Sequence, residues 1–88
     1  MALISPKVLA QVSCRSNTAL AAMSWEWVLR ADGQVLYRLT MVDGRRERNP
    51  WTLVAQLNPA QLQSFREDRD QAAAMLGNLA RQHGHQAG

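Results

Sequence analysis

The stretch SWEWVLRADGQVLYRLTMV alternates apolar and polar side chains on both sides of one Asp-Gly pair. Such alternation is typical of half-buried strands, and an Asp-Gly pair between two of them predicts a hairpin, because glycine supplies the positive φ of the turn. A three-residue loop sets Trp27 opposite Tyr37 and Glu26 opposite Arg38, whereas a two-residue loop sets Trp27 opposite Arg38. Matched cross-strand pairs each contribute roughly 0.2–1 kcal/mol, so we predict the three-residue loop, residues 31–33.

A second alternating run, WTLVAQL at residues 51–57, follows the polar segment DGRRERNP. It predicts a further antiparallel strand with four side chains on its inner side: Trp51, Leu53, Ala55 and Leu57. All three tryptophans and the tyrosine then share one face of a meander. We interpret these rings as core rather than as a ligand platform.

The chain after residue 57 carries strong signals for the start of a helix. Asn58 is a good N-cap, Pro59 suits the first helical position, and Gln61 completes a capping box. An apolar stripe at helical spacing follows, and it predicts one long helix over the aromatic face of the sheet: Leu62, Phe65, Ala72, Leu76 and Leu79. Arg69 falls inside this stripe, where it would snorkel past the sheet, meet an acidic group or contact a partner. We expect residues 83–88 to be a frayed tail.

The beginning of the chain allows more than one interpretation. Residues 7–14 alternate as a strand would, but Ser5-Pro6 is also a good helix start, so residues 5–14 are either strand or helix; we favour the strand. A helix there would make the element order similar to that of double-stranded-RNA-binding domains, although residues 58–61 lack the lysines of that family. A single helix over residues 18–31 is a further, less favoured alternative.

Together these patterns predict an α+β fold, in which a three- or four-stranded antiparallel meander packs on one long C-terminal helix. A chain of 88 residues with 47% hydrophobic side chains is suited to one domain, residues 1–88, with a core at about residues 7–82. The lone Cys14 and the lack of an apolar run of about 18 residues or more favour a cytoplasmic protein without a membrane segment.

The candidate chemistry is sparse. The net charge is +3, and the one compact basic cluster is Arg45, Arg46 and Arg48. Cys14 has only His83 and His85 as candidate bases, both in the expected tail, and two histidines do not complete a metal site. We therefore expect no enzymatic activity, no metal and no cofactor.

Two surfaces are candidates for binding. The outer sheet face offers apolar side chains at Val28, Leu36 and Val54, and the last helix offers a small-residue seam at Ala73, Gly77 and Ala80. Contiguous apolar patches on small proteins often mark partner sites. The sequence thus favours a non-enzymatic module that binds a protein partner or its own copy as a homodimer. The alternative is a nucleic-acid-binding protein that uses the arginines of residues 45–48.

Overall fold

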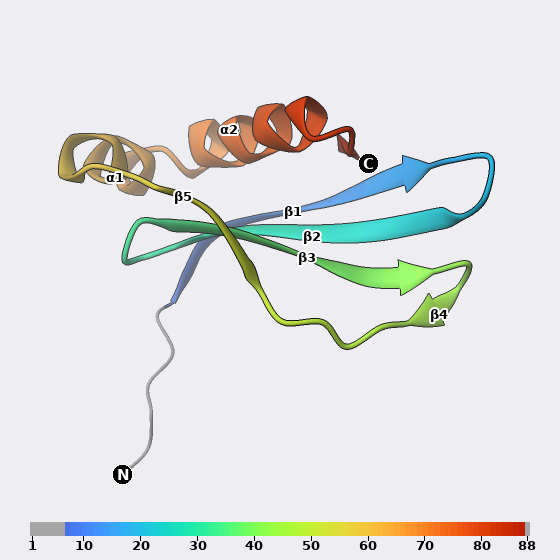
Figure 1. Cartoon of the computed structure of the whole chain (residues 1–88). Helices are drawn as coiled ribbons and strands as arrows, with labels where there is room; N and C mark the ends of the chain where they lie inside the picture. The colour runs from blue at the N-terminus through green and yellow to red at the C-terminus, as the bar shows by residue number, and fades with distance from the viewer. Residues whose placement is uncertain (1–6, 88) are drawn as a thin grey trace, which may run out of the picture.

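The computed structural model describes residues 7–87 and is an α+β fold, as predicted (Figure 1). Four antiparallel strands run in the order β1-β2-β3-β5; β4 also pairs with β3, and β6 with β1. Both helices lie on one side of this sheet. The elements are β1 Val8–Asn17, β2 Ala22–Arg30, β3 Gln34–Val42, β4 Arg45–Arg46, β5 Thr52–Gln56, α1 Pro59–Glu67, α2 Arg69–Gln82 and β6 Gln86–Ala87.

The predicted hairpin between β2 and β3 is confirmed residue by residue. Trp27 pairs with Tyr37 and Glu26 with Arg38. Gly33 closes the turn at φ +88°, and its amide donates to the carbonyl of Arg30 at 2.9 Å. Because residues 8–17 and 22–30 are strands, a helix at the start of the chain and a single helix over residues 18–31 are both wrong.

The core lies between the inner face of the sheet and α2. Trp27, Leu29 and Val35 face Leu76 and two alanines of α2, and all of these side chains are fully buried. Small side chains on the helix let its backbone approach the sheet closely. Burial of one large apolar side chain stabilises a fold by about 1.5–3 kcal/mol, so the contact of the sheet with α2 contributes strongly to the stability of the domain.

Strand β5 departs from the prediction at one position. Val35 pairs with Ala55, but Leu36 pairs with Leu53, so Val54 is an extra residue in a β-bulge. A bulge reverses the faces of the residues beyond it, because side chains alternate with a period of two. The prediction that Trp51 and Leu53 face the core is therefore wrong: Leu53 is 56% exposed, and the ring of Trp51 lies on the outer face, 4.3 Å from the guanidinium carbon of Arg38.

Two helices replace the single long helix that we expected. The capping box at Asn58 is confirmed, but α1 ends at Glu67, and the backbone of the following Asp68 is extended at φ −134° and ψ 94°. The Asp68 carboxylate accepts from the amide of Gln71 at 3.0 Å and so caps α2. Aspartate is a weak former of helix interiors and a strong N-cap, which favours a new helix here. The break changes the helical phase, so Arg69 is exposed. The prediction that Arg69 lies in the apolar stripe is therefore wrong.

The end of the chain is an integral part of the fold, so the expectation of a frayed tail is wrong for residues 83–87. Gly84, at φ +84°, turns the chain after α2, and the amide of His85 donates to the carbonyl of Ala80 at 2.8 Å. The last described residues form β6 and pair with Cys14 and Arg15 of β1. The tail thereby joins the sheet as β6, an edge strand beside β1.

Candidate functional site

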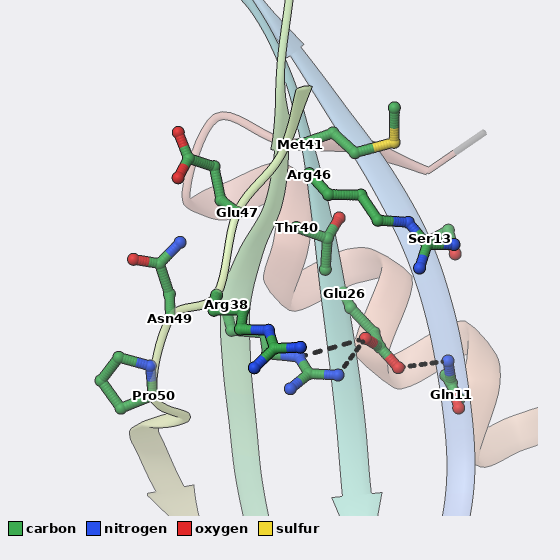
Figure 2. A pocket seen from close by; sticks show the side chains of 11 residues that line it. Gln11, Ser13, Glu26, Arg38, Thr40, Met41, Arg46, Glu47, Asn49 and Pro50 are labelled. Carbon is green, nitrogen blue, oxygen red and sulfur yellow. Dashed lines mark hydrogen bonds and ion pairs between the residues drawn. The ribbon is translucent and has the colours of Figure 1, made fainter. Parts of the chain in front are cut away.

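A groove lies on the outer face of the sheet, opposite the helices (Figure 2). Its volume is about 880 Å³, comparable to that of ligand-binding clefts. Three long strands supply its floor, and β4 with the segment that follows supplies its rim. We call this site the outer groove; its lining is Gln11, Ser13, Glu26, Arg38, Thr40, Met41, Arg46, Glu47, Arg48, Asn49 and Pro50.

A fixed charge pair lies on the floor of the outer groove. The Glu26 carboxylate accepts from the guanidinium of Arg38, with Nη2 at 3.1 Å and Nε at 3.3 Å, and from the side-chain amide of Gln11 (Figure 2). The same guanidinium stacks on the ring of Trp51, an arrangement that adds cation–π attraction. Glu26 and Arg38 therefore form a salt bridge in which the two charges largely cancel.

The rim of the outer groove is tied to the edge of β3. The amide of Glu47 donates to the carbonyl of Thr40 at 2.9 Å, and the side-chain amide of Asn49 donates to the carbonyl of Leu39 at 3.1 Å. These bonds continue the edge of β3 between its pairing with β4 and its pairing with β5. The rim is thus held in place by hydrogen bonds to the sheet, which favours a preformed site.

The arginine cluster predicted from sequence is divided by the fold. Arg46 and Arg48 line the outer groove, whereas Arg45 does not, because adjacent strand residues point to opposite faces. The Arg46 side chain extends across the sheet toward Ser13 of β1 (Figure 2). Neither Arg46 nor Arg48 forms an ion pair with any of residues 7–87. The outer groove therefore contains two exposed guanidiniums that form no ion pair within the described residues, together with the carboxylate of Glu47.

The residues predicted to bind a partner are largely interior. Val28 and Leu36 are only 1% and 6% exposed, and Ala80 is fully buried in the core with Gly77 also buried. Only Val54 and Ala73 keep partial exposure. Of the small-residue seam, Ala80 therefore packs in the core against the sheet and Gly77 is buried, and the prediction of an exposed apolar patch at Val28 and Leu36 is wrong.

A smaller hollow of about 380 Å³ lies beside the helices. Phe65, Met75 and Leu79 contribute its large apolar side chains, and Ala74 with polar residues of α2 completes it. These three side chains also pack against the core. The hollow is therefore a shallow gap along the core, with less polar chemistry to orient a ligand than the outer groove has.

The two histidines of the tail belong to the aromatic core. His85 is 7% exposed and stacks on Trp25, with ring centroids 4.1 Å apart and planes at 15°. The indole NH of Trp27 donates to Nδ1 of His85 at 3.1 Å. His83 is exposed, with its ring 5.3 Å from that of Trp27. This cluster, which the sequence patterns did not indicate, anchors the tail rather than forming a base for catalysis.

Acidification is expected to destabilise the domain through His85. Burial, aided by the charge of neighbouring His83, holds the pKa of His85 below its usual value of 6.5. The imidazole of residue 85 thus binds a proton more readily in the unfolded chain than in the folded one. The contribution of neutral His85 to the free energy of unfolding is therefore complete above about pH 6.5. It is lost as the pH falls toward the pKa of the folded state, by up to about 1.4 kcal/mol per pH unit. Urea unfolding at a series of pH values in this range measures the slope of the free energy of unfolding against pH. His85→Phe should flatten this slope, and His83→Asn, at an exposed position, should keep most of it. Equal slopes in wild type and His85→Phe would refute the role of His85.

Cys14 is not placed for nucleophilic chemistry. Burial raises the pKa of its thiol, although the charge of Arg81 opposes this, and a reactive cysteine needs the reverse. Among residues 7–87, no three His, Cys, Asp or Glu side chains are grouped closely enough to hold a metal ion. Neither described helix is long and apolar enough to cross a membrane.

No family model matches the chain, and no curated protein or solved structure is significantly similar to it. The candidate site therefore depends on geometry alone. Its floor could have been found from the sequence by aligning the outer positions of the strands, because Glu26 and Arg38 were already predicted to pair there. The binding surface predicted on that face consists of its apolar side chains, Val28, Leu36 and Val54.

Proposed function

We propose that this chain is a non-enzymatic binding module that docks a protein partner in the outer groove. The observation that carries the proposal is the construction of the groove: its rim is hydrogen-bonded to β3, and its floor is a satisfied polar network around Glu26. Preformed sites bind with a lower entropic cost than sites that must be ordered on binding. A buried thiol and a neutralised carboxylate favour binding over catalysis.

The groove also suits a protein segment in its chemistry. Protein-binding sites commonly combine a few oriented polar groups with adjoining aromatic or aliphatic surface. Here Ser13 and Gln11 are exposed beside Met41, and the stacked pair of Arg38 and Trp51 borders the rim. This mixture supports recognition of an extended segment rather than of a small apolar ligand.

A photoreactive amino acid at Ser13 is expected to cross-link a partner protein in cells that express the chain. The same residue at Leu53 is the control, because Leu53 is exposed on the same sheet face but does not line the groove. With the partner purified, Ser13→Trp should weaken binding at least tenfold by filling the groove, and Leu53→Trp should change it less than twofold, as measured by calorimetry. Equal cross-linking at both positions, or equal affinities, would contradict the proposal.

A nucleic-acid-binding function is the second candidate. It is favoured by the exposed, unneutralised charges of Arg46 and Arg48, to which Arg45 adds charge on the other side of β4. Phosphate contacts release counterions, so such binding would weaken steeply with salt. Failure of duplex DNA, duplex RNA and single strands to bind at low salt would remove this candidate.

A further inference from the structure

We infer that the partner segment held by the outer groove is acidic, with spaced carboxylates that pair with Arg46 and Arg48. This inference rests on the proposed function and adds the chemistry of the partner. Arg38 is already paired with Glu26, so the positive charge in excess of Glu47 resides on the guanidiniums of Arg46 and Arg48, neither of which forms a salt bridge within residues 7–87. Guanidinium groups bind carboxylates through paired, charge-assisted hydrogen bonds.

The position of Arg46 makes this contact geometrically direct. Its exposed side chain extends from β4 across the sheet toward Ser13 (Figure 2). A segment lying along the groove would therefore pass under or beside this guanidinium. Since the rim is fixed to β3 through Glu47 and Asn49, the arginines are presented from a defined backbone.

A carboxylate-bearing peptide suits these charges better than a phosphate backbone does. Glu26 lies on the floor and Glu47 also lines the groove, so evenly spaced phosphates would meet carboxylates as well as arginines. Arg45 does not line the groove, and one face of Trp51 is covered by Arg38, which limits it as a stacking platform for bases. A peptide can place acidic residues at the arginines and neutral residues at the glutamates.

The test compares fluorescent peptides of equal length by anisotropy. One carries two glutamates separated by glycine in an otherwise glycine-serine sequence, the second replaces both glutamates with glutamine, and the third replaces them with lysine. We expect the glutamate peptide to bind at least tenfold more tightly than the other two. Arg46→Glu and Arg48→Glu should each weaken this binding about tenfold. Circular dichroism verifies that the variants are folded.

Arg45→Glu is the matched control, because it changes the net charge equally on the same two-residue strand but outside the groove. Arg45→Glu should change the affinity for the glutamate peptide by less than about twofold. Equal losses from Arg45→Glu and Arg46→Glu, or equal binding of glutamate and glutamine peptides, would overturn the inference. Tighter binding of a single-stranded RNA than of the glutamate peptide, lost in Arg46→Glu, would also overturn it in favour of a nucleic-acid site.

The two proposals fail separately. If the partner cross-linked at Ser13 has no acidic segment and the glutamate peptide does not bind, the acidic inference fails and the docking site stands. If no partner cross-links at Ser13 more than at Leu53, the proposed function fails, and peptide binding would then describe only the charge preference of the groove.

Discussion

Removing residues 83–88 is expected to lower the free energy of unfolding by about 3–4 kcal/mol, although these residues are only a short tail. The deletion removes His85, which stacks on Trp25 and accepts from the indole NH of Trp27. The stacked pair contributes about 1 kcal/mol, the hydrogen bond about 1 kcal/mol, and the newly exposed ring surface the remainder. Trp27 would also retain a donor without its partner.

Urea unfolding followed by tryptophan fluorescence measures this loss. His83→Asn is the control, since His83 is exposed and accepts no hydrogen bond from Trp27; it should change the stability by less than about 1 kcal/mol. A truncated chain as stable as the full-length chain would show that the tail contributes nothing to the core.

Gly33→Ala is expected to destabilise the domain by about 2–3 kcal/mol. At φ +88°, an L side chain is strained by about 1–2 kcal/mol. The added Cβ would also lie 2.8 Å from Nε2 of Gln56 and 3.3 Å from the carbonyl oxygen of Leu57. Gln56 donates to the carbonyl of Asp32 at 2.9 Å, so its displacement costs a hydrogen bond that joins the turn to β5.

Gly44→Ala is the matched control for this prediction. Gly44 has nearly the same backbone, at φ +82°, but a Cβ there would meet nothing within 4 Å. Gly44→Ala should therefore lower the free energy of unfolding only by the backbone strain, about 1–2 kcal/mol. Denaturant unfolding of both variants separates strain from crowding. If Gly44→Ala lowers the free energy of unfolding as much as Gly33→Ala does, crowding of the new Cβ against Gln56 and Leu57 contributes nothing to the effect of Gly33→Ala.

The parts of the fold that depend on neighbouring residues were predictable. The register of the β2–β3 hairpin follows from opposite pairs such as Glu26 with Arg38, and the start of α1 follows from the capping box at Asn58. The break between the helices also had a signal, since Asp68 can cap the amide of Gln71 and Arg69 did not fit an apolar stripe. We gave the continuous stripe more weight than these cues.

Features that depend on distant contacts were not predictable from the pattern. Leu53 and Val54 are both apolar, so the sequence does not show which of them faces the core. It therefore does not reveal that the bulge at Val54 reverses the faces of the earlier residues, which exposes Leu53 and places Trp51 beside Arg38. His85 is buried by Trp27, 58 residues away in the chain, and no local pattern records that contact.

The candidate site was predicted only in part. The arginines of residues 45–48 were identified as a cluster, but the fold separates Arg45 from Arg46 and Arg48. The polar floor was not predicted, because contiguous apolar residues are the usual sequence signal of a partner site on a sheet face. Those apolar residues, Val28 and Leu36, are buried instead. Burial of this kind depends on how the twisted sheet and its neighbouring segments pack, which alternation alone does not specify.

The central claim is that the outer face of the sheet, rather than the helical face, binds the partner. Amide chemical-shift mapping by NMR during titration with the partner cross-linked at Ser13 tests it most directly. The account predicts the largest shifts at Gln11, Glu26, Arg38 and Arg46 of the outer groove. Shifts concentrated instead at Phe65, Met75 and Leu79, beside the helices, would contradict it.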